Sequence, residues 1–297
     1  MLCIMKMLWV FFALLACLIP QIMALRINCT TPSPDEAYRA ESFEIYKASV
    51  NRDIERGAHP RLFKRRRINI DVYFTVITSG STLGKGSVED VSILAQMTVL
   101  NQAFRRSGFQ FNLKNTIYVD KPEWANSNGD DGLQARQRLC RRGSYKALNI
   151  IVIPGMDNAG RCTFPGSYAD SMLLNDRCEI GTAALPHTGT DSLGRVVVHE
   201  VGHWLGLMHT FEGGCNGEGD QVDDTPAHIQ GDQIEKCPSK APDTCPGKPG
   251  KDPIHNFMSY FEESCWNNEE GFTDGQIMRM QQQWDHFRAN APDKTLS

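Results

Sequence analysis

The sequence predicts an α/β (α+β) fold, a twisted mixed sheet with packed helices followed by an irregular, cystine-rich region that ends in a helix. Two observations carry this prediction. Between residues 68 and 153, strand-like apolar segments alternate with a helix-like segment, which is typical of a sheet with helices on its faces. After residue 210, cysteine, glycine and proline become dense, and regular periodicity is lost until a final helical pattern.

The elements of the sheet layer are predicted one by one. Residues 68–77 (INIDVYFTVI) alternate apolar and polar side chains, as in a half-buried strand. The sequence SVED at 87–90 resembles a capping box, and the helix that it opens should stop before Gly108. Residues 109–119 favour a second strand. The continuous apolar run 148–153 (LNIIVI) is typical of a central strand.

Two further helices complete the prediction. One should begin near Leu193 and carry the polar motif described below. The last should run over residues 273–288, with Ile277, Met280 and Trp284 packed on one face.

The start of the chain predicts a secretory signal peptide over residues 1–24. Residues 7–19 (MLWVFFALLACLI) are uniformly apolar, follow Lys6 and lead to a small-residue exit at Ala24. A membrane anchor is the weaker alternative, because spanning a bilayer needs about 20 apolar residues. No second run of membrane length follows, so we expect a secreted protein without a membrane span.

Charge divides the remainder into a basic leading segment, residues 25–67, and an acidic body, residues 68–297. The leading segment holds ten Lys/Arg and six Asp/Glu, a net charge of +4, and the body carries −9. An inhibitory pro-segment docked on a catalytic domain would show such complementarity. The basic cluster at 64–67 fits either a processing site or a solvated turn. No basic stripe with interleaved aromatic residues is present, which disfavours nucleic-acid binding.

The stretch 199–209 (HEVGHWLGLMH) predicts a zinc site. His199 and His203 are four apart, so a helix places both imidazoles on one face, as half of a tetrahedral site. Glu200 is angled away from direct ligation and suits a general base acting on the metal's water. Gly206 can end the helix at positive φ, which lets the chain return His209 as third ligand. A buried helix with satisfied core histidines is the weaker interpretation of the whole pattern.

Eight cysteines remain after the signal peptide, and an even number in an oxidising compartment predicts disulfides. Four lie between residues 215 and 265, where regular structure is sparse, so disulfides would hold this region together. A second metal site is the alternative, but no two of these cysteines have the compact spacing of a zinc clip. The eight are Cys29, Cys140, Cys162, Cys178, Cys215, Cys237, Cys245 and Cys265.

The stretch 199–209 resembles the extended zinc signature of the metzincin metallopeptidases. Their methionine turn is matched by NFMSY at 256–260. Further segments, DDTP at 223–226 and FTDGQIMRM at 272–280, are similar to the pappalysin-like family, most closely to its secreted fungal extracellular metalloproteases.

This resemblance extends over residues 68–288 and implies a metzincin-like catalytic domain at 68–297. The domain would consist of an upper subdomain, residues 68–209, and a lower one, residues 210–297. Residues 142–149 (RGSYKALN) and 161–165 (RCTFP) are also similar to segments of the family, but the match is thinner before Leu193.

The resemblance also assigns roles. The three histidines of the motif match the zinc ligands, and Glu200 matches the base that polarises the attacking water. Met258 matches the turn methionine, an apolar floor that does not ligate the metal. For Tyr260 two interpretations stay open: a phenol that donates to the oxyanion in the transition state, or a structural tyrosine of the turn.

Calcium is a second cofactor that the resemblance implies, in the loop after the third histidine. Asp220, the carbonyl of Val222 and the hydroxyl of Thr225 would supply hard oxygen ligands. A merely solvated acidic loop is the alternative.

By the same resemblance, Cys215 would pair with Cys245 and Cys237 with Cys265. Cys162 with Cys178 is a further expected pair. Related proenzymes use an N-terminal cysteine followed by glycine as a plug on the zinc.

In this chain Thr30 follows Cys29. Cys29 is therefore either a latency switch or half of a disulfide, with Cys140 or another partner. The even number of cysteines favours the disulfide, because a switch would leave seven. Asn28 begins a glycosylation acceptor pattern.

The predicted function is peptide-bond hydrolysis by a secreted, zinc-dependent endopeptidase that acts on extracellular proteins or peptides and that we expect to be a monomer. The substrate should add itself as a strand to a sheet edge. Glu262 and Glu263 either line a pocket for basic side chains or face solvent. The alternatives are a catalytically silent metzincin-like binding module and a zinc hydrolase of another amide, such as one in a cell-wall polymer.

Overall fold

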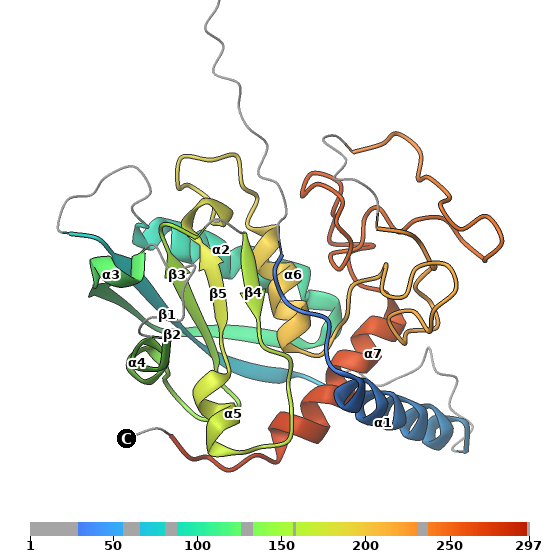
Figure 1. The fold of residues 1–297 in the computed structure, drawn as a ribbon, viewed down its shortest axis with the longest axis horizontal. Helices are drawn as coiled ribbons and strands as arrows, with labels where there is room; N and C mark the ends of the chain where they lie inside the picture. Colours follow the sequence, from blue (N-terminus) through green and yellow to red (C-terminus); the bar gives the residue numbers. More distant parts are fainter. Residues whose placement is uncertain are drawn as a thin grey trace, which may run out of the picture.

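A five-stranded sheet in the order β2-β1-β3-β5-β4 organises the first part of the fold (Figure 1). The computed structural model describes residues 29–55, 66–80, 88–125, 133–156, 159–230 and 237–295. The predicted signal peptide and Asn28 lie outside the described residues. The strands are β1 (Ile68–Thr78), β2 (Phe109–Asp120), β3 (Leu148–Ile153), β4 (Gly160–Cys162) and β5 (Cys178–Gly181). The helices are α1 (Glu36–Glu55), α2 (Asp90–Ala103), α3 (Pro122–Ala125), α4 (Leu133–Cys140), α5 (Asp170–Asn175), α6 (Arg195–Trp204) and α7 (Asp274–Gln283), with short turns η2 (Arg105–Ser107) and η3 (Thr182–Ala184) and the terminal turn η4 (Trp284–Ala289).

The pairing of the strands confirms the predicted mixed sheet. β1 pairs in parallel with β2 and β3, β3 pairs in parallel with β5, and the edge strand β4 runs antiparallel to β5. All six residues of β3 are buried, as expected for a central strand that is covered on both faces.

Helices cover both faces of this sheet. Alternate residues of β1, such as Ile70 and Phe74, share one apolar cluster with α2 and α6. Ile151 and Ile153 of β3 belong to a second cluster with Trp124 of α3 and the end of α4. The histidine motif lies on α6, a helix packed against the sheet beside β4 and β5.

One predicted helix start was wrong. α2 begins at Asp90 with Glu89 as its N-cap, and no side chain caps it. Ser87, the expected cap, lies outside the described residues. The backbone N–H groups of Ser92 and Ile93 bond instead to the carbonyl of Glu89.

The C-terminal part is built differently. Between residues 205 and 273, the described residues contain no helix or strand. A disulfide joins Cys215 to Cys245, and the predicted final helix follows as α7 and η4. Thr273 and Gln276 form a capping box at the start of α7.

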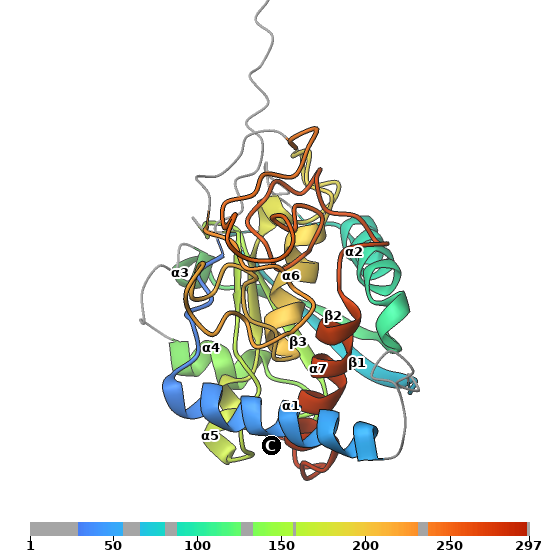
Figure 2. The same cartoon turned by 90° about the vertical axis from the view of Figure 1, so that its right-hand side faces the viewer.

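The leading segment crosses this final helix. α1 packs on α7, as Figure 2 shows, with Ser42, Tyr46 and Ser49 buried at a helical spacing. Among the described residues, no helix is both long and apolar enough to cross a membrane.

Candidate metal centre and active site

The motif helix α6 ends where the sequence predicted. Gly206 adopts a φ of +94°, and a Cβ there would approach Cγ of Gln283 to 2.7 Å. Both facts require glycine at this turn. The chain then reverses and brings His209 back toward the helix.

The three histidines converge through their Nε2 atoms. Nε2 of His203 lies 3.1 Å from Nε2 of His199 and 3.1 Å from Nε2 of His209. Nδ1 of His199 lies 2.6 Å from the carbonyl of Phe257, and Nδ1 of His203 lies 2.7 Å from the carbonyl of Leu207. Because a carbonyl only accepts, each Nδ1 carries the proton and each Nε2 keeps a lone pair for a metal.

Burial keeps these imidazoles neutral. It lowers the pKa of His199 to about 4, although the bond to Phe257 opposes the shift. It also lowers the pKa values of His203 and His209 well below the usual 6.5, assisted by the neighbouring histidines. Three neutral, buried imidazole nitrogens around one point are the donor set that zinc prefers, so the residues fit the implied metal.

Glu200 lies beside this cluster and is fully buried. Its Oε2 accepts a hydrogen bond of 2.9 Å from Thr31, whereas Oε1 is buried without a partner among the described atoms. Burial raises the pKa of Glu200 to about 7. Gly160 of β4 makes room for this side chain, because a Cβ there would approach Cγ of Glu200 to 2.7 Å.

Met258 packs under the helix. A Cβ on Gly202 would meet the Met258 sulfur at 2.4 Å, and the Met258 carbonyl accepts from the backbone of Thr210 at 3.1 Å. The methionine therefore packs against α6 at Gly202, and its backbone bonds the residue that follows His209.

The Tyr260 ring lies beside the histidine cluster. Its ring centroid lies 4.7 Å from that of His209 and 5.8 Å from that of His199. Its hydroxyl donates to the carbonyl of Cys29 at 3.0 Å. Burial raises the pKa of Tyr260, so the phenol stays a proton donor at neutral pH.

The leading segment enters the site. The Sγ of Cys29 lies 3.6 Å from Nε2 of His203 and joins the three histidines in one cluster of donor atoms. Cys29 is a free thiol, so the expected disulfide with Cys140, which is also free, is absent. Cys29 forms a parallel bridge with Gly160 on the edge strand β4. This pairing places the thiol beside the histidines.

The cysteine pairs that the sequence suggested differ in outcome. The Cys215–Cys245 and Cys162–Cys178 disulfides are present, the second across paired strands β5 and β4. Cys237 and Cys265 are free thiols, so the expected bridge between them is absent from the structure.

The expected calcium ligands lie together. Oδ1 of Asp220 accepts from the Thr225 hydroxyl at 2.6 Å and from the Val222 backbone at 3.2 Å. The Thr225 hydroxyl is also 2.8 Å from the Val222 carbonyl. Oδ2 of Asp220 is buried without a partner among the described atoms, and burial raises the pKa of this carboxyl to about 7. An orphaned buried carboxylate oxygen beside two further oxygens fits a hard cation.

Both interpretations of Glu263 were wrong. Only 5% of this residue is exposed, and its carboxylate accepts from the backbones of Leu193 and Val196 at the start of α6. Glu262 is half-buried and accepts from the hydroxyl of Ser264 at 3.0 Å. The signal in the sequence was the lack of a capping side chain at Gly194, which leaves the helix start in need of a distant acceptor.

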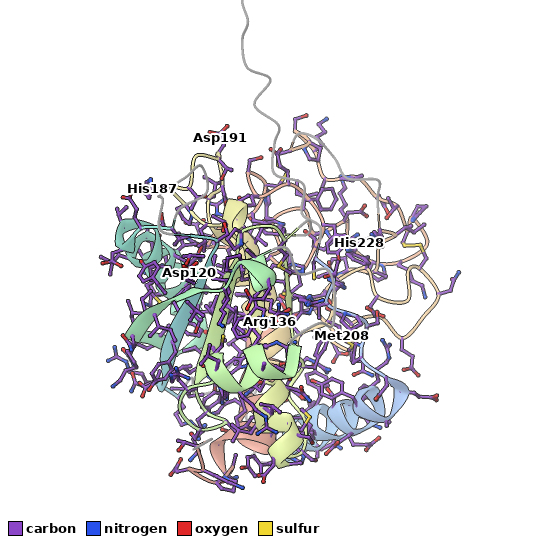
Figure 3. The ribbon with its side chains drawn as sticks, turned by 60° about the vertical axis from the view of Figure 1, so that its left-hand side comes forward. Asp120, Arg136, His187, Asp191, Met208 and His228 are labelled. Carbon is purple, nitrogen blue, oxygen red and sulfur yellow. A yellow bond between two sulfur atoms is a disulfide. The ribbon has the colours of Figure 1, made fainter. Side chains whose placement is uncertain are left out.

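Thr31, Gly160 and Glu212 are site residues that sequence reasoning missed. Glu212 follows the third histidine and binds Arg39 of α1 at 3.2 Å and Ser33 at 3.2 Å. Farther along the same loop, His228 accepts from or donates to the Thr210 hydroxyl at 2.8 Å. Figure 3 labels His228 among the C-terminal loops and Met208 near α1.

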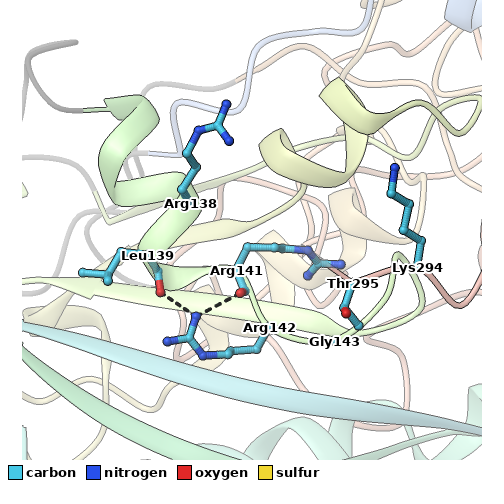
Figure 4. Close-up of a pocket in the computed structure, with 7 residues that line it drawn as sticks. All are labelled: Arg138, Leu139, Arg141, Arg142, Gly143, Lys294 and Thr295. Carbon is cyan, nitrogen blue, oxygen red and sulfur yellow. Dashed lines mark hydrogen bonds between the residues drawn. The ribbon is translucent and has the colours of Figure 1, made fainter. Parts of the chain in front are cut away.

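A basic hollow of about 640 Å³ involves none of these residues (Figure 4). It lies between the end of α4 and the C-terminal tail. The Arg142 guanidinium donates there to the carbonyls of Leu139 and Arg141, which suits the negative end of a helix. The lining residues are Arg138, Leu139, Arg141, Arg142, Gly143, Lys294 and Thr295.

Known proteins resemble this chain in both sequence and fold. The model of peptidase family M43, described as pregnancy-associated plasma protein-A, matches residues 146–285. Extracellular metalloproteases of Pyricularia oryzae and Neurospora crassa are 38% and 36% identical, over 88% and 89% of this chain and 90% of each relative.

Among solved structures, a promirolysin mutant of Tannerella forsythia has a TM-score of 0.64 and 24% identity, and covers 87% of this chain and 94% of its own. Mature mirolysin in complex with a cleaved peptide has a TM-score of 0.60 and covers 72% of this chain and 90% of its own.

Proposed function

Because this chain belongs to the pappalysin family of metzincin metallopeptidases, together with the fungal extracellular metalloproteases, we propose that it is a secreted zinc endopeptidase with Glu200 as general base. The observation that carries this proposal is the convergence of three neutral Nε2 atoms beside a buried carboxylate. His199, His203 and His209 would hold the metal.

Each neighbouring side chain has a defined task in this proposal. Zinc, when bound, supplies Lewis acidity that polarises the scissile carbonyl and makes water more acidic. Glu200 takes a proton from the attacking water and passes it to the leaving amine, for which a carboxyl with a pKa near neutrality is suited. The Tyr260 phenol, once free of Cys29, donates a hydrogen bond to the developing oxyanion.

The leading segment, residues 25–67, acts as a pro-segment in this proposal. Cys29 lies beside the histidines, and the Thr31 hydroxyl donates a hydrogen bond to Glu200. Arg39 forms a salt bridge with Glu212. Substrate and general base are thereby kept apart until cleavage in the basic cluster that ends at Arg67. The oxygen cluster at Asp220 would bind calcium and brace the loop after the third histidine.

The backbone of the leading segment also suggests how substrate binds. Thr30 donates its N–H to the Gly160 carbonyl of the edge strand β4 at 3.0 Å. An extended peptide from an extracellular protein would use the same strand edge after the segment leaves.

Casein hydrolysis by the purified protein, cut near Arg67, tests the function. Glu200→Gln should fold and retain zinc, but lose turnover by about 10²–10⁴-fold, because general-base catalysis has that magnitude. Removal of zinc by a chelator should abolish hydrolysis, and added zinc should restore it. Glu262→Gln, a change in a carboxylate outside the cluster, is the matched control and should retain activity.

Other outcomes would reject the proposal. A variant that keeps a tenth of the activity would exclude Glu200 as the base. Zinc binding with no hydrolysis of casein or of wall polymers would favour the silent binding module, and hydrolysis of wall polymers alone would favour the other amide hydrolase.

Latency is tested on the uncut chain. Thr31→Val removes the hydroxyl from Glu200 while keeping the shape of the side chain. Hydrogen bonds to charged groups contribute about 1.5–3 kcal/mol, so leak activity should rise by roughly tenfold or more. Leak activity equal to that of the wild type would contradict the role of Thr31.

A further inference from the structure

The start of α6 lacks a cap of its own. Its N-cap position is Gly194, which offers no side chain, so the first backbone N–H groups need acceptors from elsewhere. Glu263, about seventy residues away, accepts from one N–H of the first turn and from Leu193, which lies just before the N-cap. Its Oε2 accepts from Leu193 N at 2.9 Å, and its Oε1 accepts from Val196 N at 2.8 Å.

The contact of Glu263 with the helix start is reciprocal. The Arg195 guanidinium, on the first turn of α6, donates to the Glu263 carbonyl at 2.8 Å and to the Trp266 carbonyl. The Ser192 hydroxyl lies 3.3 Å from Oε2 of Glu263. A buried carboxylate at the positive end of a helix also gains from the helix dipole.

The same segment holds α6 at two further levels. The carbonyl of Phe257 accepts from Nδ1 of His199, and the Trp266 ring stacks on the His199 ring with centroids 5.8 Å apart and planes 5° apart. One turn later, Met258 packs against Gly202. Residues 257–266 therefore contact the helix from its first turn to Gly202.

Among these contacts, that of the Glu263 carboxylate is made with the backbone at the start of the helix. His199 and Glu200 begin only three and four residues after Val196, so a shift of the helix start moves both groups. His209 lies beyond the helix and is held by other contacts, such as that of Thr210 with Met258. A displacement of about 1 Å at reacting groups can cost about 10²-fold in rate.

We propose that Glu263 is a positioning residue, which locks the start of α6 to the methionine turn and so sets His199 and Glu200 relative to His209. This inference rests on the proposed function for its kinetic readout, but not for its metal-binding readout. Glu263 itself touches neither the metal ligands' Nε2 atoms nor the substrate strand.

The experiment uses Glu263→Ala and Glu263→Gln, with Glu262→Ala and Glu262→Gln as matched controls. The two glutamates are neighbours on the same turn, but the carboxylate of Glu262 bonds Ser264 rather than α6. Three quantities are measured on the holoenzyme: kcat and KM for casein-derived peptides, the rate of zinc loss to a chelator, and the unfolding temperature.

Glu263→Ala should lower kcat at least tenfold while KM stays within about twofold, since a misplaced base affects the chemical step more than substrate binding. Zinc loss should accelerate about tenfold, because a histidine that is displaced with the helix holds the metal less tightly. Glu263→Gln keeps one acceptor oxygen and should fall between Glu263→Ala and the wild type. Both Glu262 variants should match the wild type.

Equal kcat and equal zinc loss in Glu263→Gln and Glu262→Gln would overturn the proposal. So would a lower unfolding temperature with unchanged kcat at temperatures where the protein is folded, because that is a merely structural effect. A wild type that binds zinc but hydrolyses nothing would reject the proposed function, while the zinc-loss comparison would still decide the role of Glu263.

Discussion

The regions on the two sides of α6 are stabilised in different ways. Residues 68–204 form a sheet and helices whose interior is apolar, with β3 buried along its whole length. Residues 205–273, where the structure describes them, have no helix or strand. Apolar side chains of this region, such as Phe257 and Trp266, join the core cluster of the sheet region. A disulfide and local polar contacts, such as that of Asp252 with the backbone and hydroxyl of Thr244, hold the rest of its path.

This difference between the sheet region and the loop region indicates what a single substitution changes in each of them. In the sheet region, burial is shared among many residues, so changes alter the free energy of unfolding and barely alter the shape. In the loop region, each contact fixes a few residues. The site lies at the junction, with two histidines from the helix and a third from the loop side.

Removal of the Glu179 carboxylate should have the largest effect on the free energy of unfolding. Such a result would show that the interior of the sheet region is not stabilised by apolar burial alone. Glu179 lies in β5 and is buried, where it binds Arg136 at 3.2 Å and Arg177 at 2.9 Å and also contacts Arg161. Glu179→Gln should lower the free energy of unfolding by roughly 3–5 kcal/mol, because it leaves buried guanidinium charge without this partner. Chemical denaturation measures the loss, and a loss below about 1 kcal/mol would contradict it.

The same carboxylate should make stability depend on pH. Burial alone would raise the pKa of Glu179, but Arg177, Arg161 and Arg136 together hold it below its usual 4.5. A folded-state pKa below the unfolded value stabilises the protein above pH 4.5, and this stabilisation is lost as pH falls through the folded-state pKa. Denaturation from neutral pH down to about pH 3 should therefore show a smaller acid loss in Glu179→Gln than in the wild type. Parallel curves would refute the linkage.

Truncation of a buried side chain in the central strand β3 should have the next largest effect. It would sharpen the comparison between the sheet region and the loop region. Ile150→Ala removes a fully buried side chain of β3 and should cost about 2–4 kcal/mol through lost burial and a cavity. Leu94→Ala, which removes a similar side chain from an exposed position on α2, is the control. Its effect should stay below about 0.5 kcal/mol. Similar losses in the two variants would mean that apolar burial does not dominate this region.

Opening the disulfide should cost about 2–4 kcal/mol, the typical range for a loop of this length. Cys215→Ser combined with Cys245→Ser should also increase hydrogen exchange in residues 210–260 more than in β3. Uniform loosening of both regions would show that they unfold as one unit.

The smallest effect should come from a single loop contact. Thr244→Val removes a hydroxyl that donates to Asp252 at 3.0 Å and accepts from the Ile229 backbone at 3.0 Å. The expected loss is about 1 kcal/mol. Thr98→Val, on the exposed face of α2, is a control with a hydroxyl bonded only within its own helix.

Local patterns explain what could be predicted. The alternation in β1, the apolar run of β3 and the spacing of His199 and His203 follow from neighbouring residues, and the structure contains all three. The family resemblance supplied the Cys215–Cys245 pair, which spacing alone leaves open.

Contacts between distant segments could not be predicted in this way. Glu263 caps a helix 67 residues earlier in the chain, and Thr31 reaches Glu200 across 169 residues. Nothing in the periodicity near either residue indicates its partner, because the partner is chosen by the tertiary fold. The even number of cysteines likewise favoured a disulfide at Cys29, whereas the backbone β-bridge to Gly160 places the thiol beside the histidines.

The bridge between Cys29 and Gly160 has a consequence for solubility. β4 is an outer strand of the sheet, and an open strand edge is a template for association with another chain. While Cys29 and Thr30 cover Gly160, that template is blocked by the molecule's own backbone. While the leading segment is in place, pairing of another chain with β4 at Gly160 is therefore disfavoured.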